Sequence, residues 1–167
     1  MVCDGFQISV AFITMSGITS LLQTLKELEK RDIKGEILTT NYLNFSEPKA
    51  LKKLNELSNI TLKMYDVEAS DEGFHTKGYI FRKDEIYRII IGSSNITSAA
   101  LTSNREWNTR LISTEQGEMT KEIIGSGEDR ALLISATGAH VILMTGRTTF
   151  IYKEFGPVFS IFIKIYG

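Results

Sequence analysis

The chain has 167 residues, of which 43% are hydrophobic and 23% are charged, and its formal net charge is −1 at pH 7. This balance is typical of a single soluble globular domain, and it excludes a disordered or fibrous chain. With one cysteine, Cys3, and two histidines, His75 and His140, the chain can build neither a disulfide framework nor a zinc site.

Predicted strands and helices alternate through the first 65 residues. Apolar, β-branched runs predict three strands, at 6–14, 36–40 and 60–65. Between them, leucines at helical spacing predict one helix that Ser16 caps and Gly35 ends, and a second that Pro48 opens and Asn59 closes. Because strands joined by helices pair in parallel, we expect a largely parallel sheet with active groups at the strand ends.

The next segments add antiparallel strands. Two further strands are predicted at 75–82 and 86–91, and the charged connection 83–85 between them indicates a hairpin, so the sheet is mixed. A helical start at 98–101, a strand at 106–112 and a helix at 113–124 follow. We expect residues 1–124 to form one mixed α/β domain in which helices flank the sheet.

Residues 125–167 have a different character. A glycine-containing break at 125–130 precedes several apolar, β-prone runs, at 131–136, 139–144, 149–153 and 155–166. We expect a β-rich C-terminal extension that packs on the same domain or at a dimer interface. Nothing in its residues indicates a function.

The residues with the most chemistry lie around the predicted hairpin. His75 and Lys77 are two positions apart, so in a strand they share one face. The turn from Gly92 to Asn95 then leads into a predicted helix, whose free N–H groups attract anions. A base, a cation, an amide and a helix N-terminus at one place suit a phosphate ester.

These residues resemble a known family. His75-x-Lys77 followed by Gly92-Ser-x-Asn95 is similar to the HKD signature of the phospholipase D superfamily. The wider runs resemble its nuclease branch, the PLD-like domains of certain restriction endonucleases and bacterial helicase-type proteins; they are 74–81, 91–97, 100–101 and 104–108. The resemblance covers about residues 6–115. The chain departs from the commonest pattern at Arg82, where that pattern has aspartate, and in a longer gap between the histidine and the glycine.

The resemblance implies a mechanism. The imidazole of His75 would attack phosphorus and form a phosphohistidine, and a second histidine, from a second copy of the motif, would protonate the leaving oxygen. Here there is one copy, and His140 lacks a lysine two positions on. The resemblance therefore implies a two-fold homodimer that shares one site. This chemistry requires no metal and no cofactor.

Roles follow for eight residues. We predict as catalytic His75, Lys77, Asn95 and Glu106, and as substrate-binding Ser93, Ser94, Arg105 and Asn108. Lys77 and Asn95 would bind the non-bridging oxygens of the phosphate. Glu106 would accept the second ring N–H of His75; the alternative is a strand carboxylate paired with an arginine. The nearby aromatic residues, including Tyr79 and Trp107, are predicted to pack in the core.

Three functions remain open from the sequence. The first is a metal-independent nuclease, acting on DNA as a homodimer, and an excess of cations over acids between 75 and 110 favours it. The second is a non-catalytic nucleic-acid-binding module of a helicase or restriction system, which Arg82 and the unusual tail favour. The third is a phospholipid-directed phosphodiesterase or transferase, ranked lower because no membrane-docking helix is evident. With no secretion signal and no apolar run of roughly 18 residues, we expect a cytoplasmic protein without membrane partners.

Overall fold

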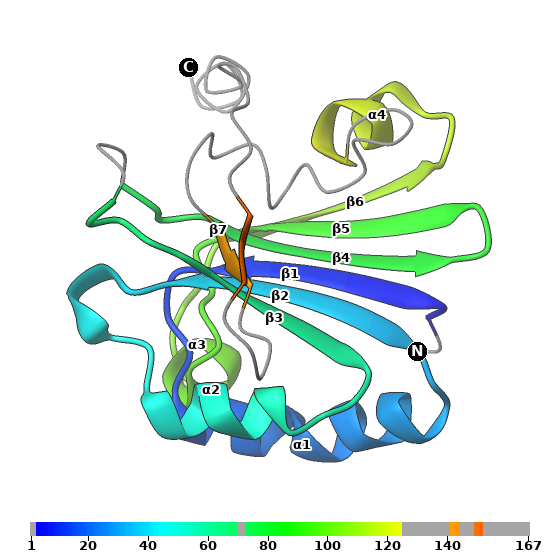
Figure 1. Cartoon of the computed structure of the whole chain (residues 1–167). Helices are drawn as coiled ribbons and strands as arrows, with labels where there is room; N and C mark the ends of the chain where they lie inside the picture. Colours follow the sequence, from blue (N-terminus) through cyan, green and yellow to red (C-terminus); the bar gives the residue numbers. More distant parts are fainter. Residues whose placement is uncertain (1–2, 70–72, 125–140, 144–148, 152–167) are drawn as a thin grey trace.

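The structure is a computed structural model that describes residues 3–69, 73–124, 141–143 and 149–151 (Figure 1). The strands are β1 Gly5–Val10, β2 Lys34–Thr40, β3 Ile60–Tyr65, β4 Lys77–Lys83, β5 Ile86–Gly92, β6 Asn108–Thr114, β7 Val141–Leu143 and β8 Thr149–Ile151. The α-helices are α1 Met15–Lys30, α2 Pro48–Asn55, α3 Ser98–Thr102 and α4 Glu118–Ile124, and a 3₁₀ turn, η1, covers Tyr42–Asn44.

One mixed sheet organises the described residues. The strand order is β6-β5-β4-β1-β2-β3-β7-β8. Strands β1, β2 and β3 are parallel, joined by α1 and α2, and the remaining described pairs are antiparallel, including the β4–β5 hairpin. The mixed α/β fold with flanking helices is therefore confirmed. Strand β7 pairs with β3, whereas the division into 1–124 and 125–167 stays a prediction.

Helices cover the two faces of the sheet unequally. In Figure 1, α1 and α2 run beneath β1, β2 and β3, and α4 lies on the opposite side near β5 and β6. On α1, the apolar stripe buries Ile18, Leu25 and Leu28 in the larger core. Each such side chain contributes roughly 1.5–3 kcal/mol when fully buried. On the other face Ile124 packs with Ile89 in a smaller cluster.

The ends of several elements differ from the expected ones. Thr14 caps α1 in place of Ser16: its hydroxyl accepts the Gly17 N–H at 3.2 Å. Strand β4 begins at Lys77, so His75 lies in the segment just before the strand. Strand β6 begins at Asn108, so Glu106 also precedes its strand. The hydrogen bond from the Gly17 N–H to Thr14 decides the start of α1, and differences of one or two residues are ordinary at strand ends.

Some of the predicted features lie in parts of the chain that the structure does not describe. The predicted strand 131–136, His140 and the apolar run 155–166 lie outside the described residues. Within the described part of the chain, no helix is both long and apolar enough to cross a lipid bilayer.

Candidate active site

Two loops meet where β1 and β5 end. The segment after β1 runs parallel to the one after β5: the Ile96 N–H donates to the Phe12 carbonyl at 3.1 Å, and the Thr14 N–H donates to the Ile96 carbonyl at 3.0 Å. The Phe12 N–H also donates to Oδ1 of Asn95 at 3.1 Å. This paired backbone holds the turn 92–95 against the edge at which the parallel strands end.

His75 and Lys77 are in direct contact at this edge. The Lys77 Nζ lies 2.7 Å from Nδ1 and 2.9 Å from Nε2 of His75, and 3.0 Å from its carbonyl oxygen. The imidazole is exposed and lies edge-on to the Phe12 ring, with centroids 6.0 Å apart. Lys77 is only 7% exposed, which is rare for lysine. The predicted shared direction of the two side chains is what places them together.

Burial and charge favour the neutral imidazole. Partial burial and then the nearby Lys77 charge lower the pKa of His75 below its ordinary value. Burial also lowers the pKa of Lys77, while the negative charge of Glu106 acts in the opposite direction. An imidazole that is neutral near pH 7 offers a lone pair to an electrophile.

Glu106 faces the turn rather than the histidine. The Ser93 hydroxyl donates a short hydrogen bond to Oε2 of Glu106, and the Asn104 amide donates to Oε1 at 3.2 Å. These two hydrogen bonds, together with the Lys77 charge, hold the pKa of Glu106 below its ordinary value. Glu106 is therefore coupled to His75 through Lys77, and its expected hydrogen bond to the imidazole is replaced by bonds to Ser93 and Asn104.

Ser94 and Asn108 contact each other. Ser94 is buried, and its hydroxyl accepts the Asn108 amide at 2.8 Å, while its carbonyl accepts the Tyr79 hydroxyl at 2.8 Å. Both contacts tie the turn to β4 and β6. Arg105 is exposed beside this network. The structure thus places His75, Lys77, Ser93 and Glu106 in one cluster, and uses Ser94 and Asn108 to support it.

The sequence predicted that the N-terminus of the helix after the turn would attract an anion, but α3 is too short for that role. It has five residues, and the Thr97 hydroxyl accepts the Ala100 N–H at 3.2 Å. The sequence analysis assigned Phe12 and Tyr79 no role at the site; Tyr79 packs against the larger core, as predicted, and its hydroxyl also supports the turn. Tyr79 could have been found, because it lies two positions from Lys77 and shares its face. Phe12 could not, because only the tertiary pairing of the two loops brings it to His75.

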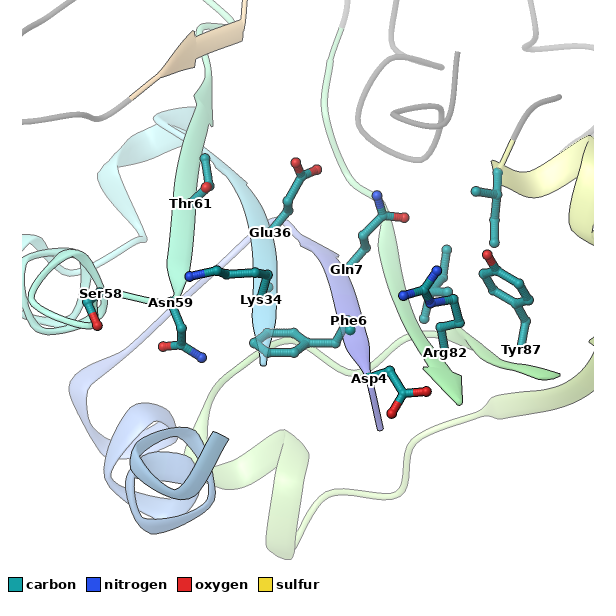
Figure 2. A pocket seen from close by; sticks show the side chains of 14 residues that line it. Asp4, Phe6, Gln7, Lys34, Glu36, Ser58, Asn59, Thr61, Arg82 and Tyr87 are labelled. Atoms are coloured by element: carbon teal, nitrogen blue, oxygen red, sulfur yellow. The ribbon is translucent and has the colours of Figure 1, made fainter. Parts of the chain in front are cut away.

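Arg82, the departure from the commonest motif, lies far from the cluster. It lies five positions along β4 from Lys77, which is roughly 16 Å along a strand. It lines a cavity of about 580 Å³ at the opposite end of the sheet, together with Asp4, Lys34 and Glu36 (Figure 2). Arg82 is therefore not among the residues around His75, and this cavity is separate from the candidate site.

Metal ligands do not gather in the described residues. Histidine, cysteine and acidic side chains there form no group of three or more that could hold an ion. The predicted independence from metal stays a prediction.

Fold and cluster together define a class. The mixed sheet, and the contact between His75 and Lys77 at the start of β4, agree with the resemblance of these residues to the phospholipase D superfamily. Residues 5–125 match the family described as "Cardiolipin synthase, PLD-like domain", and the chain belongs to this PLD-like family.

Two solved structures have the same fold. Polyphosphate kinase from Porphyromonas gingivalis aligns with a TM-score of 0.58 and 11% identity, over 97% of this chain and 23% of that one. Phosphatidylserine synthase from Haemophilus influenzae Rd KW20 aligns with a TM-score of 0.56 and 14% identity, over 99% of this chain and 40% of that one. The chain thus spans less than half of either protein. A search of curated proteins found no match.

Proposed function

We propose that this chain is one half of a metal-independent phosphodiesterase that cleaves nucleic acid, most directly DNA, through a phosphohistidine at His75. The observation that carries the proposal is the contact between the Lys77 ammonium and both ring nitrogens of His75. A neutral imidazole has one unprotonated nitrogen, so the ammonium can donate to either ring nitrogen according to the tautomer but to only one at a time, and to neither when both are protonated. The pair therefore selects the nucleophilic form of the histidine and places a cation where phosphate oxygens would bind.

In the proposed first step, a ring nitrogen of His75 forms a bond to phosphorus while the bond from phosphorus to the leaving oxygen breaks. The electron pair of that bond goes to the leaving oxygen, which takes a proton from an acid. Water then attacks the phosphohistidine, releases His75 and returns a proton to the same acid–base group. As the substrate enters, Lys77 would break its hydrogen bond to the imidazole and bind a non-bridging oxygen of the phosphate instead.

The acid in this scheme is His75 of a second protomer. The described residues around the cluster include lysine and glutamate but no second histidine. The lowered pKa of Glu106 keeps that carboxyl deprotonated, so it has no proton to give to the leaving oxygen. A two-fold homodimer would supply a second imidazole across a shared site.

A phospholipid-directed transferase is the second candidate function. The family description names cardiolipin synthase, and one structural neighbour is a phosphatidylserine synthase. A largely apolar groove of about 400 Å³ also reaches the cluster's supporting residues. It is lined by Phe6, Ile8, Leu21, Thr24, Leu25, Leu28, Tyr79, Phe81, Ile90, Ser94, Ala100, Leu101 and Asn108. Against this candidate, Trp107 is the one exposed apolar residue between 104 and 110, and the other exposed residues there are polar or cationic: Asn104, Arg105, Asn108, Thr109 and Arg110.

The test compares wild type with His75→Ala and Lys77→Met in EDTA, using single-stranded DNA, plasmid DNA and phosphatidylglycerol vesicles as substrates. We expect wild type to cleave DNA, His75→Ala to be inactive, and Lys77→Met to be slower by about 10²-fold. Trapping labelled phosphate on wild type at acid-quenched early times would identify the covalent intermediate. Release or exchange of lipid headgroups without DNA cleavage would favour the transferase, and DNA binding without cleavage would favour a non-catalytic module.

A further inference from the structure

Trp107 is unusual among the residues around the cluster. It is 90% exposed, although the sequence predicted it to pack in the core. It is also the single tryptophan of the chain. Its neighbour Glu106 carries the hydrogen bond from Ser93 and acts on Lys77. A large apolar ring is therefore held in solvent within one residue of the proposed phosphate site.

The backbone of Trp107 is fixed by two hydrogen bonds. Its N–H donates to the Ser93 hydroxyl at 3.1 Å, and its carbonyl accepts the Ser93 N–H at 3.0 Å. Gly92 permits this approach, because a Cβ there would overlap the Trp107 carbonyl. An exposed ring on a fixed backbone loses less freedom on binding than one on a free loop, which favours a role in ligand contact.

We infer that the Trp107 indole stacks on a nucleobase next to the scissile phosphate, and that the substrate is therefore single-stranded or unpaired nucleic acid. This inference rests on the proposed function. Arg105 lies two positions before Trp107 and is exposed. Proteins bind single strands by combining an aromatic platform with cations that follow the backbone, because every base has a face to stack and every phosphate a charge to pair. Paired bases are already stacked and do not offer that face.

A membrane contact fits this surface less well. Residues that dock in a lipid interface are grouped as an apolar face. The exposed neighbours of Trp107 are instead polar or charged; they are Asn104, Arg105, Asn108, Thr109 and Arg110. A single indole among such groups matches a base-stacking residue better than a bilayer anchor.

Fluorescence excited at a wavelength that tryptophan absorbs and tyrosine does not tests the inference directly, because Trp107 is the single tryptophan of the chain. The measurement uses the full-length His75→Ala protein, so that binding is observed without cleavage. We expect oligothymidylate to quench the emission, and an abasic strand of the same length, which has the same phosphates, to bind without quenching. Equal quenching by the abasic strand, or a shift to shorter wavelength with phosphatidylglycerol vesicles in place of strands, would overturn the inference.

Cleavage kinetics supply the second readout. In the otherwise wild-type protein, Trp107→Ala should weaken single-strand binding by roughly 5- to 100-fold, Trp107→Phe should retain part of it, and duplex should be a poor substrate for all. Ile112→Ala, which removes another exposed apolar side chain, is the matched control and should have no effect. Unchanged single-strand affinity in Trp107→Ala, or loss of the dimer in that variant, would contradict stacking. Quenching without any cleavage by wild type would refute the proposed function alone.

Discussion

At the scale of single residues, the pKa of His75 makes the proposed mechanism testable by pH. Burial and the Lys77 charge hold that pKa below the ordinary value of about 6.5. Because one His75 must be neutral and His75 of the second protomer must be protonated, activity should rise with pH along an acid limb below about pH 6.5 and fall again at higher pH. Lys77→Gln removes a positive charge, so the pKa should rise and the acid limb of kcat/KM should move to higher pH.

A lysine on the same strand provides the control for that shift. Lys83 pairs with Asp4 at 3.0 Å at the far end of β4, so Lys83→Gln should leave the acid limb in place. A limb that moves to lower pH in Lys77→Gln, or that moves equally in both variants, would mean that Lys77 does not set the protonation of His75.

The backbone of Leu43 has a left-handed conformation that residues with a side chain rarely adopt. It adopts φ 49° and ψ 17° within η1 and is well exposed. A left-handed conformation costs a non-glycine residue roughly 1–2 kcal/mol, whereas glycine adopts it freely. Allowing for the greater freedom of glycine in the unfolded chain, Leu43→Gly should raise the free energy of unfolding in urea by about 0.5–1 kcal/mol. Leu43→Ala keeps the backbone cost and should change it little; a destabilised glycine variant would refute the explanation.

At the scale of elements, the contact between α1 and the 95–97 segment leaves no room for a larger side chain. A Cβ on Gly17 would overlap the carbonyl of Ile96, which is backbone and cannot rotate away. Glycine to alanine within a helix ordinarily stabilises by about 1 kcal/mol. At Gly17 the sign should reverse: Gly17→Ala should lower the free energy of unfolding by roughly 1–3 kcal/mol and reduce phosphodiesterase activity, because the Asn95 turn must move.

A second glycine provides the comparison. A Cβ on Gly117 would meet the Ser113 hydroxyl, which belongs to a flexible side chain. Gly117→Ala should therefore be milder in chemical denaturation and should leave activity intact. Equal effects of the two substitutions would mean that the close contact between α1 and the turn does not determine the geometry of the site.

At the scale of the whole molecule, the proposed homodimer predicts how activity depends on composition. When wild type and His75→Ala are refolded together in varying ratios, a site that needs two histidines should lose activity as the square of the wild-type fraction. A site that needs one histidine should lose it linearly. Sedimentation of the same mixtures should show dimers at micromolar concentration, and a monomer that cleaves DNA would exclude the shared site.

Much of this molecule could be predicted from local sequence. The alternation of strands and leucine-spaced helices through residue 65 correctly indicated the parallel part of the sheet, because burial on both faces of a strand leaves a continuous apolar run. The 83–85 connection correctly indicated the hairpin. The two-residue spacing of His75 and Lys77 indicated their contact, since neighbours two apart on extended backbone share a face.

Other features arise from contacts between segments far apart in sequence. The bonding of Glu106 to Ser93 and Asn104, the edge-on position of Phe12 against His75, and the exposure of Trp107 depend on the pairing of β5 with β6 and of the 12–14 segment with Ile96. Periodicity reports which face a side chain occupies but not which distant backbone lies opposite it. The types of residue at the site were thus set by local pattern, whereas their partners were decided by tertiary packing, because hydrogen bonds between loops depend on where the sheet brings their ends together.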